Sequence, residues 1–221
     1  MRFSPSWPEL LVALAIAACG AAARTHSRAA APEGASGGTP GQDPSLPPAG
    51  FGSLRQEQLG VNLATTNLRI RVIPLDERVI RLLAPDAYRS LHDMLDSRTT
   101  DILAAARAAG RGDSVALFMV TFFGMQPQTR FNPDDLLIVS QNATFRPIGR
   151  VAFTPRFNEN ELSVREQAAA IYLYEPGIAI LRPFTVQYGI TVSDAWSQSL
   201  NLINAERTRV LARAAASTPQ P

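Results

Sequence analysis

The sequence contains no lysine, so all 21 of its basic residues are arginines. The net charge is only +2 over 221 residues, and the arginines do not form a contiguous block. Domains that bind nucleic acids usually concentrate positive charge on one surface. We therefore do not expect a nucleic-acid partner.

Cysteine occurs once and histidine twice, at Cys19, His26 and His92. One cysteine excludes an internal disulfide, and the three residues do not follow the spacing of a zinc site. The sequence also lacks a phosphate-binding glycine loop and a Gly-x-Ser-x-Gly element. It therefore predicts neither a metal nor a cofactor.

The apolar run at residues 10–18, LLVALAIAA, is too short to cross a bilayer as a stable helix. It follows a short positive start at Met1-Arg2, as the hydrophobic region of an export signal does. It ends in Ile16-Ala17-Ala18-Cys19-Gly20, which is an aliphatic residue, two small residues and a cysteine. We therefore predict a signal peptide over residues 1–18.

This ending resembles the lipobox of bacterial lipoproteins. The resemblance implies cleavage between Ala18 and Cys19 and attachment of acyl groups to Cys19, the new first residue. Two or more acyl chains hold a protein firmly on a membrane, at about 0.8 kcal/mol per buried CH₂. The resemblance therefore implies a lipid-anchored envelope protein. The residue after the cysteine is Gly20 and not aspartate, which favours the outer membrane over the inner one.

Two other interpretations of the N-terminus stay open. Residues 21–23 are all alanine and fit an ordinary signal-peptidase site, which would release a secreted or periplasmic soluble protein. Alternatively, the apolar run stays uncleaved as a helix in which Cys19 is one more small residue.

Residues 19–50 follow as a segment dominated by alanine, glycine, proline and serine, with Leu46 as its one large aliphatic residue. Such a segment cannot bury enough apolar surface to offset the entropy lost on ordering. We predict a disordered tether here, a single globular domain over residues 51–215, and a disordered tail over residues 216–221.

Strand patterns dominate the predicted domain. Residues 68–72 alternate apolar residues with arginines, which predicts a half-buried strand with Arg69 and Arg71 outward. Residues 115–123 are almost wholly apolar, which predicts a central strand buried on both faces. Further strands, separated by proline and glycine, are predicted at residues 79–83, 136–140, 150–153, 168–174, 178–181 and 184–188.

Two segments show helical spacing instead. The first begins at Pro85 and ends at Gly110, and residues 97–100 offer a point at which it could divide. The second follows Ser193, a good N-cap. Its apolar stripe fits either core packing or a membrane-surface or partner-binding helix. The stripe consists of Trp196, Leu200, Ile203, Val210 and Ala214.

Together these elements predict an α+β, mainly β domain. We expect an antiparallel β-sandwich, of which an immunoglobulin-like arrangement is one form, with a helical insertion and a C-terminal amphipathic helix.

Arg111-Gly112-Asp113 spells the RGD adhesion tripeptide. It follows the predicted first helix, where Gly-Asp-Ser is also ordinary turn chemistry, so a turn and an adhesion loop are both open. Gly112-Asp113-Ser114 resembles the start of the GDSL hydrolase signature. That family places its histidine far downstream, whereas both histidines here lie upstream, so the general base is missing.

The remaining acidic motifs favour structural roles. His92 and Asp96 lie one helical turn apart, but a metal would need more ligands, which favours an exposed helix face. Asp134-Asp135 after Pro133 predicts a turn into a strand, since the spaced oxygen ligands of a calcium loop are absent.

We therefore predict a membrane-anchored envelope lipoprotein whose domain is a binding or structural accessory module for an envelope protein. The alternative is an envelope enzyme that uses a carboxylate pair, such as a glycan hydrolase; no catalytic residue is identified. A binding module would expose an apolar or arginine-rich patch, whereas a hydrolase would bring two carboxylates together in a concave pocket.

Overall fold

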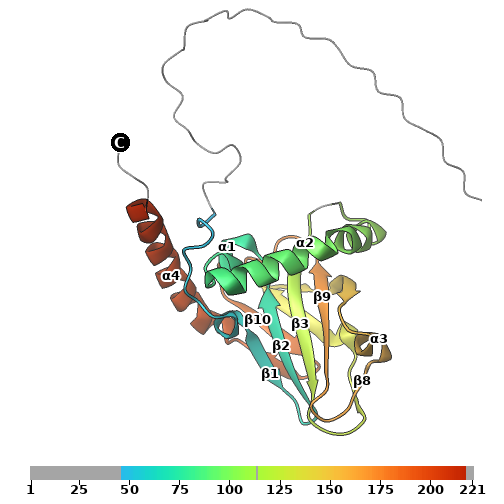
Figure 1. The fold of residues 1–221 in the computed structure, drawn as a ribbon. Helices are drawn as coiled ribbons and strands as arrows, with labels where there is room; N and C mark the ends of the chain where they lie inside the picture. The colour runs from blue at the N-terminus through green and yellow to red at the C-terminus, as the bar shows by residue number, and fades with distance from the viewer. Residues whose placement is uncertain (1–45, 113, 218–221) are drawn as a thin grey trace, which may run out of the picture. The chain divides into compact units, whose positions relative to one another are not determined.

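The computed structural model describes residues 46–112 and 114–217 (Figure 1). Ala18, Cys19, Asp113 and most of the predicted tether lie outside these residues. Within the described ranges, none of the helices combines the length and the apolar character that a membrane span requires.

Two antiparallel sheets dominate the fold, which confirms a mainly β architecture. The larger sheet has the order β1-β2-β3-β9-β7, so β3 occupies its centre, as expected for residues 115–123. Its strands are β1 (Val61–Ala64), β2 (Leu68–Pro74), β3 (Ala116–Gly124), β9 (Gln167–Tyr174) and β7 (Pro147–Ala152).

The second sheet has the order β11-β10-β5-β6, and a two-stranded pair, β4 and β8, lies apart from both. Every strand pair is antiparallel. The bounds are β5 (Leu136–Ser140), β6 (Ala143–Phe145), β10 (Phe184–Tyr188), β11 (Thr191–Ser193), β4 (Thr129–Arg130) and β8 (Glu161–Leu162).

Four α-helices and two short 3₁₀ turns complete the described chain. The long ones are α2 (Pro85–Ala108) and α4 (Trp196–Ser217). The short ones are η1 (Gln56–Leu59), α1 (Glu77–Ile80), η2 (Pro133–Asp135) and α3 (Arg156–Glu159).

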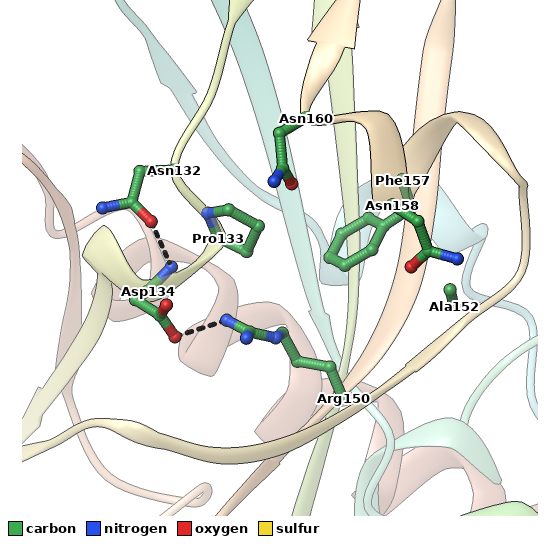
Figure 2. A pocket seen from close by; sticks show the side chains of 8 residues that line it. All are labelled: Asn132, Pro133, Asp134, Arg150, Ala152, Phe157, Asn158 and Asn160. Atoms are coloured by element: carbon green, nitrogen blue, oxygen red, sulfur yellow. Dashed lines mark hydrogen bonds and ion pairs between the residues drawn. The ribbon is translucent and has the colours of Figure 1, made fainter.

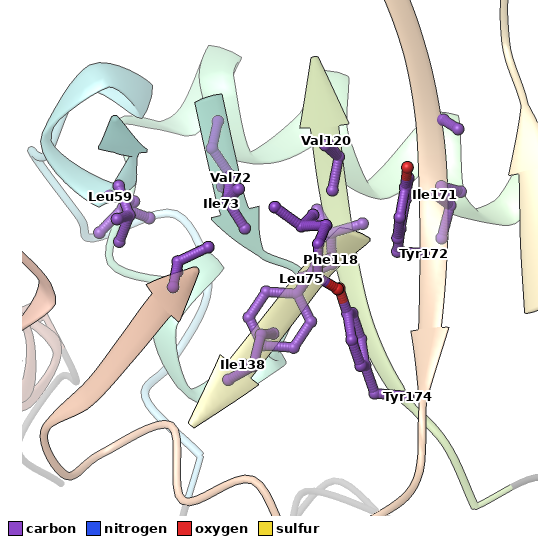
Figure 3. Packing of buried hydrophobic residues seen from close by; sticks show 14 of the residues in the cluster. Leu59, Val72, Ile73, Leu75, Phe118, Val120, Ile138, Ile171, Tyr172 and Tyr174 are labelled. Atoms are coloured by element: carbon purple, nitrogen blue, oxygen red, sulfur yellow. The ribbon is translucent and has the colours of Figure 1, made fainter. Parts of the chain in front are cut away.

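One face of the five-stranded sheet, its inner face, forms the core with β5 and β10 (Figure 3). The Phe118 ring meets that of Phe184 edge to face with centroids 6.1 Å apart, and Phe122 meets Tyr188 at 5.8 Å. The buried Tyr174 hydroxyl donates a hydrogen bond to the carbonyl of Leu136 at 3.2 Å. Aromatic contacts and one buried hydrogen bond thus join the two sheets.

Helix α2 crosses one end of the opposite, outer face of the sheet (Figure 1). It is continuous through residues 97–100, where the Ser97 and Thr99 hydroxyls donate hydrogen bonds back to the carbonyls of Met94 and Leu95 at 2.7 and 3.1 Å. These side chains therefore do not divide the helix. The other end of the outer face carries Arg69, Arg71 and Phe123.

Two predicted strands are wrong. Residues 79–83 enter helix α1 and the turn after it, because the Asp76 carboxylate caps that helix by accepting the Arg78 amide at 2.8 Å. Residues 178–181 form an irregular segment in which Ile178 and Ile180 are buried. A short apolar run indicates that a segment is buried, but periodicity alone does not distinguish a strand from a buried turn.

The prediction that β3 is buried on both faces is half right. Phe118, Val120 and Phe122 point inward and are fully buried, whereas Leu117 and Met119 on the outer face are only partly covered. Strands β1, β4, β6, β8 and β11 were not predicted, because each has at most four residues and too few positions to show an alternation.

Helix α4 packs on the core with the predicted stripe. Trp196 is fully buried, stacks on Phe184 with centroids 5.0 Å apart, and donates its indole N–H to the Ile180 carbonyl at 2.9 Å. Leu200, Ile203 and Val210 are buried behind it. The stripe therefore packs on the core, which is the first of the two roles that the sequence left open for this helix.

Glu206 on α4 is the one charged residue that is fully buried in the described chain. Its Oε1 accepts the Ser53 amide at 2.9 Å, the Ser53 hydroxyl at 2.7 Å and an Arg213 N–H at 3.0 Å. Arg209 lies 3.4 Å from its other oxygen. Burial acts to raise the pKa of Glu206, but the bonds from Ser53 and Arg213 outweigh it and lower that pKa.

Candidate binding sites

A pocket of about 300 Å³ opens at the β7 edge of the five-stranded sheet, between η2 and α3 (Figure 2). We call it the edge pocket. Its charged groups are Asp134 and Arg150, which form an ion pair across it. The full lining is Asn132, Pro133, Asp134, Arg150, Ala152, Phe157, Asn158 and Asn160.

Local structure fixes each side of this pocket. The Asn132 side chain caps η2 by accepting the Asp134 amide at 3.1 Å, which positions Asp134. Asn160 ends α3 in the left-handed conformation, with φ of 55°, which asparagine tolerates better than most residues. No hydrogen bond joins the side-chain amides of Asn158 and Asn160 to the other residues that line the pocket (Figure 2).

Tyr172 lies one strand inward from this pocket. It pairs with Arg150 across β7 and β9, so both side chains are on the inner face, and its ring meets Phe157 edge to face at 6.0 Å. Its hydroxyl is buried and has no hydrogen-bond partner within residues 46–112 and 114–217. Burial raises the pKa of Tyr172, so this hydroxyl stays protonated.

A second concavity, of about 410 Å³, lies on the uncovered end of the outer face. Three arginines line it, Arg69, Arg71 and Arg165. Its apolar members include Met125 and Val164, which are 49% and 48% exposed. We call it the arginine groove; its full lining is Arg69, Arg71, Phe123, Gly124, Met125, Val164 and Arg165.

Strand register builds one wall of the arginine groove, and a tight loop builds the other. Arg69 lies opposite Phe123 in the β2–β3 ladder. The loop over residues 163–166 packs on Gly124, where an added Cβ would meet the Ser163 carbonyl oxygen at 2.2 Å. Arg165, with φ of 66°, donates its amide to the Gly124 carbonyl at 2.9 Å. The loop thus holds a non-glycine residue in a left-handed conformation beside the groove.

The groove arginines have no acidic partner in the part of the chain that the structure describes. Arg71 donates to the Asn62 amide oxygen at 3.4 Å and lies over the Phe123 ring at 5.9 Å. Neither Arg69 nor Arg165 forms an ion pair with any residue that the structure describes. Positive charge and exposed apolar surface therefore occur together here.

Carboxylates do converge in a third depression, of about 250 Å³, which Glu159, Glu161 and Glu166 line. Arg156 lies between two of them, 2.5 Å from Glu159 and 3.5 Å from Glu166. Glu161 lies 3.3 Å from Arg130. Each carboxylate is thus paired with a guanidinium, which is typical of a surface ion-pair network.

The structure also locates the predicted adhesion residues that it describes. Arg111 forms an ion pair with Glu175, and Gly112 is exposed just beyond α2. Asp113, like the predicted lipidation residue Cys19 and cleavage residue Ala18, lies outside the described residues.

His92 lies on α2, as expected for a helix face. Its Nδ1 is 3.3 Å from Glu77 and its Nε2 is 3.6 Å from Asp96, while its ring stacks on Tyr88 at 5.3 Å. The contact with Glu77 was not predicted, because α1 and α2 are brought together only by the tertiary fold. Nowhere in the described part of the chain do three or more His, Cys, Asp or Glu residues gather as a metal site would require.

Part of the arginine groove could be predicted from the sequence. The alternation at residues 68–72 predicted that Arg69 and Arg71 point outward, which the register confirms. Arg165, Met125 and Val164 are distant in sequence and reach the groove only through the packing of loop 163–166 on Gly124.

Comparison with known proteins returns no match: no protein-family model, no curated protein and no solved structure is similar to this chain.

Proposed function

We propose that the described domain is the binding module of a lipid-anchored envelope protein, and that the arginine groove docks an acidic segment of another envelope protein. The observation that carries this proposal is the groove itself, where Arg69 and Arg165 pair with no described carboxylate and lie beside exposed Met125 and Val164. Exposed apolar residues rimmed by charge are typical of interaction sites. The charge selects an acidic partner.

The lipid anchor in this proposal is supported by the lipobox-like ending at Cys19 and by the length of chain between it and the domain. Acyl groups on Cys19 would hold the protein on the membrane, preferably the outer one. Intact mass of the membrane-extracted protein tests this. A mass for a chain starting at Cys19 plus acyl-glyceryl groups supports it, whereas a free N-terminus near Arg24 or an uncleaved chain contradicts it.

Hydrolysis of envelope glycans is the less favoured alternative. It would require a carboxylate available to donate a proton. The carboxylates of the third depression are each bound to Arg156 or Arg130. This pairing argues for a structural role, and we therefore favour binding.

We further infer that the two larger sheets form the layers of a β-sandwich. The Phe118–Phe184 and Phe122–Tyr188 ring contacts and the hydrogen bond from Tyr174 support this arrangement. An immunoglobulin-like arrangement is one form of the sandwich that we propose.

Site-specific photo-cross-linking in the host tests the docking proposal. A cross-linking amino acid at Met125 should capture a protein, whereas the same group at Leu211, which is 50% exposed on α4, should not. Replacing Arg69 and Arg71 by glutamate should lower the Met125 adduct by about tenfold or more, because like charges would then face the partner.

Three outcomes would contradict the proposal. These are an adduct that survives the charge reversal, equal capture at Met125 and Leu211, and an adduct at Met125 with lipid only.

A further inference from the structure

The edge pocket is on the opposite face of the five-stranded sheet from the arginine groove, so it is a separate site. Arg150 and Ala152 are on the inner face, in register with Tyr172 and Ala170 of β9. Arg69 and Arg71 are on the outer face. A ligand of the edge pocket would therefore bind independently of any partner in the groove.

The Tyr172 hydroxyl, buried behind this pocket and without a hydrogen-bond partner among the described residues, is the unusual feature of this region. A buried polar group without a partner destabilises the fold by about 1–3 kcal/mol, and such groups are rare in native proteins. Tyr174 on the same strand has a comparable burial, and its hydroxyl is satisfied by the Leu136 carbonyl. Packing alone therefore does not explain why position 172 carries a hydroxyl.

The position of Tyr172 links this hydroxyl to the pocket. Tyr172 is the partner of Arg150 across the ladder, and its ring contacts that of Phe157 edge to face. Both neighbours line the pocket (Figure 2). The hydroxyl itself is buried behind the lining residues, so a polar group in the pocket would reach it through a bridging water.

The lining indicates the chemistry of such a ligand. Asp134 and Arg150 neutralise each other, so the pocket favours neither an anion nor a cation. Asn158 and Asn160 each offer a donor and an acceptor, and Tyr172 offers both on one oxygen. Phe157, Pro133 and Ala152 supply an apolar wall.

We propose that the edge pocket binds a neutral, polyhydroxylated ligand the size of one sugar ring, and that Tyr172 is one of its hydrogen-bonding residues. The adjacent hydroxyls of a sugar both donate and accept hydrogen bonds. They can therefore bond to the Asn158 and Asn160 amides and to the Asp134–Arg150 pair. The less polar face of the ring fits Phe157. The volume of about 300 Å³ is at the lower end of small-molecule sites.

NMR titration of the full-length protein tests this proposal, with glucose and N-acetylglucosamine as probes. We expect saturable shifts of the Asn158 and Asn160 side-chain amide signals at millimolar sugar, and none with acetate or choline. Tyr172→Phe should weaken binding by about three- to tenfold, the loss of one hydrogen bond. The same substitution should leave the melting temperature unchanged or higher, because it removes a buried unpaired group.

Tyr174→Phe is the matched control. It removes a satisfied hydroxyl, so its melting temperature should fall while sugar affinity stays the same. The proposal is overturned by an absence of saturable shifts with either sugar, by equal binding of acetate or choline, or by wild-type affinity in Tyr172→Phe. None of these results bears on the arginine groove, which is tested by cross-linking at Met125.

Discussion

Two groups of arginines in this domain have opposite surroundings. Arg209 and Arg213 on α4 surround Glu206, a carboxylate with no exposed surface. Arg69 and Arg165 line the arginine groove, and none of the described residues in its lining carries a carboxylate. The first group secures a helix to the segment around Ser53, whereas the second forms no ion pair with a described residue. The same type of residue therefore stabilises the fold in one place, and in the other it carries the docking role that we propose.

The largest effect is expected at Glu206. Glu206→Ala removes hydrogen bonds from Ser53 and Arg213 and leaves a cavity, so the free energy of unfolding should fall by about 2–3 kcal/mol. Urea denaturation measures this change. Exposed Glu57, with no buried contacts of this kind, is the control, and Glu57→Ala should have no measurable effect. Equal effects at both positions would show that the buried network contributes little.

The pKa of Glu206 makes that contribution depend on pH. It is lowered from its ordinary value of 4.5, so the folded state favours the ionised form more than the unfolded state does. The stabilisation is therefore complete above about pH 4.5 and is lost as the pH falls through the folded pKa. The stability difference between wild type and Glu206→Gln should be constant from pH 5 to 7 and shrink towards pH 3. A difference that stays constant to pH 3 would contradict this assignment.

A smaller effect is expected where the groove is built. Gly124→Ala places a Cβ against the Ser163 carbonyl, so loop 163–166 has to move, with a loss of about 2 kcal/mol. The same substitution at Gly112 meets no atom within 4 Å and should be close to neutral. Thermal unfolding measures both. In Gly124→Ala we also expect a weaker Met125 adduct, because displacing the loop displaces Arg165.

The smallest effects on stability are expected within the groove. Arg69→Ala and Arg71→Ala should each change the free energy of unfolding by less than about 0.5 kcal/mol, since neither arginine forms an ion pair with a described residue. The same substitutions should lower the Met125 adduct. A large loss of stability at Arg69 would show that this arginine supports the fold, and the contrast with Arg209 and Arg213 would disappear.

Longer periodic patterns predicted their elements well. The arginine alternation gave β2 with the correct outward face, and the helical spacing after Pro85 gave α2. The strand predictions at residues 79–83 and 178–181 were wrong. Both segments are short apolar runs, and such a run can be buried as a strand, a helix or a turn. The Asp76 side-chain cap begins helix α1 in the first segment, and a proline–glycine turn at residues 176–177 precedes the irregular second segment.

The sequence by itself determined the central strand, the two long helices and the outward direction of Arg69 and Arg71, because each depends on local spacing. Only the tertiary structure decided which side chains meet. It brings Arg165 to the groove through Gly124, Glu206 to Ser53, and the Tyr172 ring to Phe157 in the wall of the edge pocket. These contacts join residues far apart in the chain, and they depend on strand order and helix packing, which local periodicity does not contain.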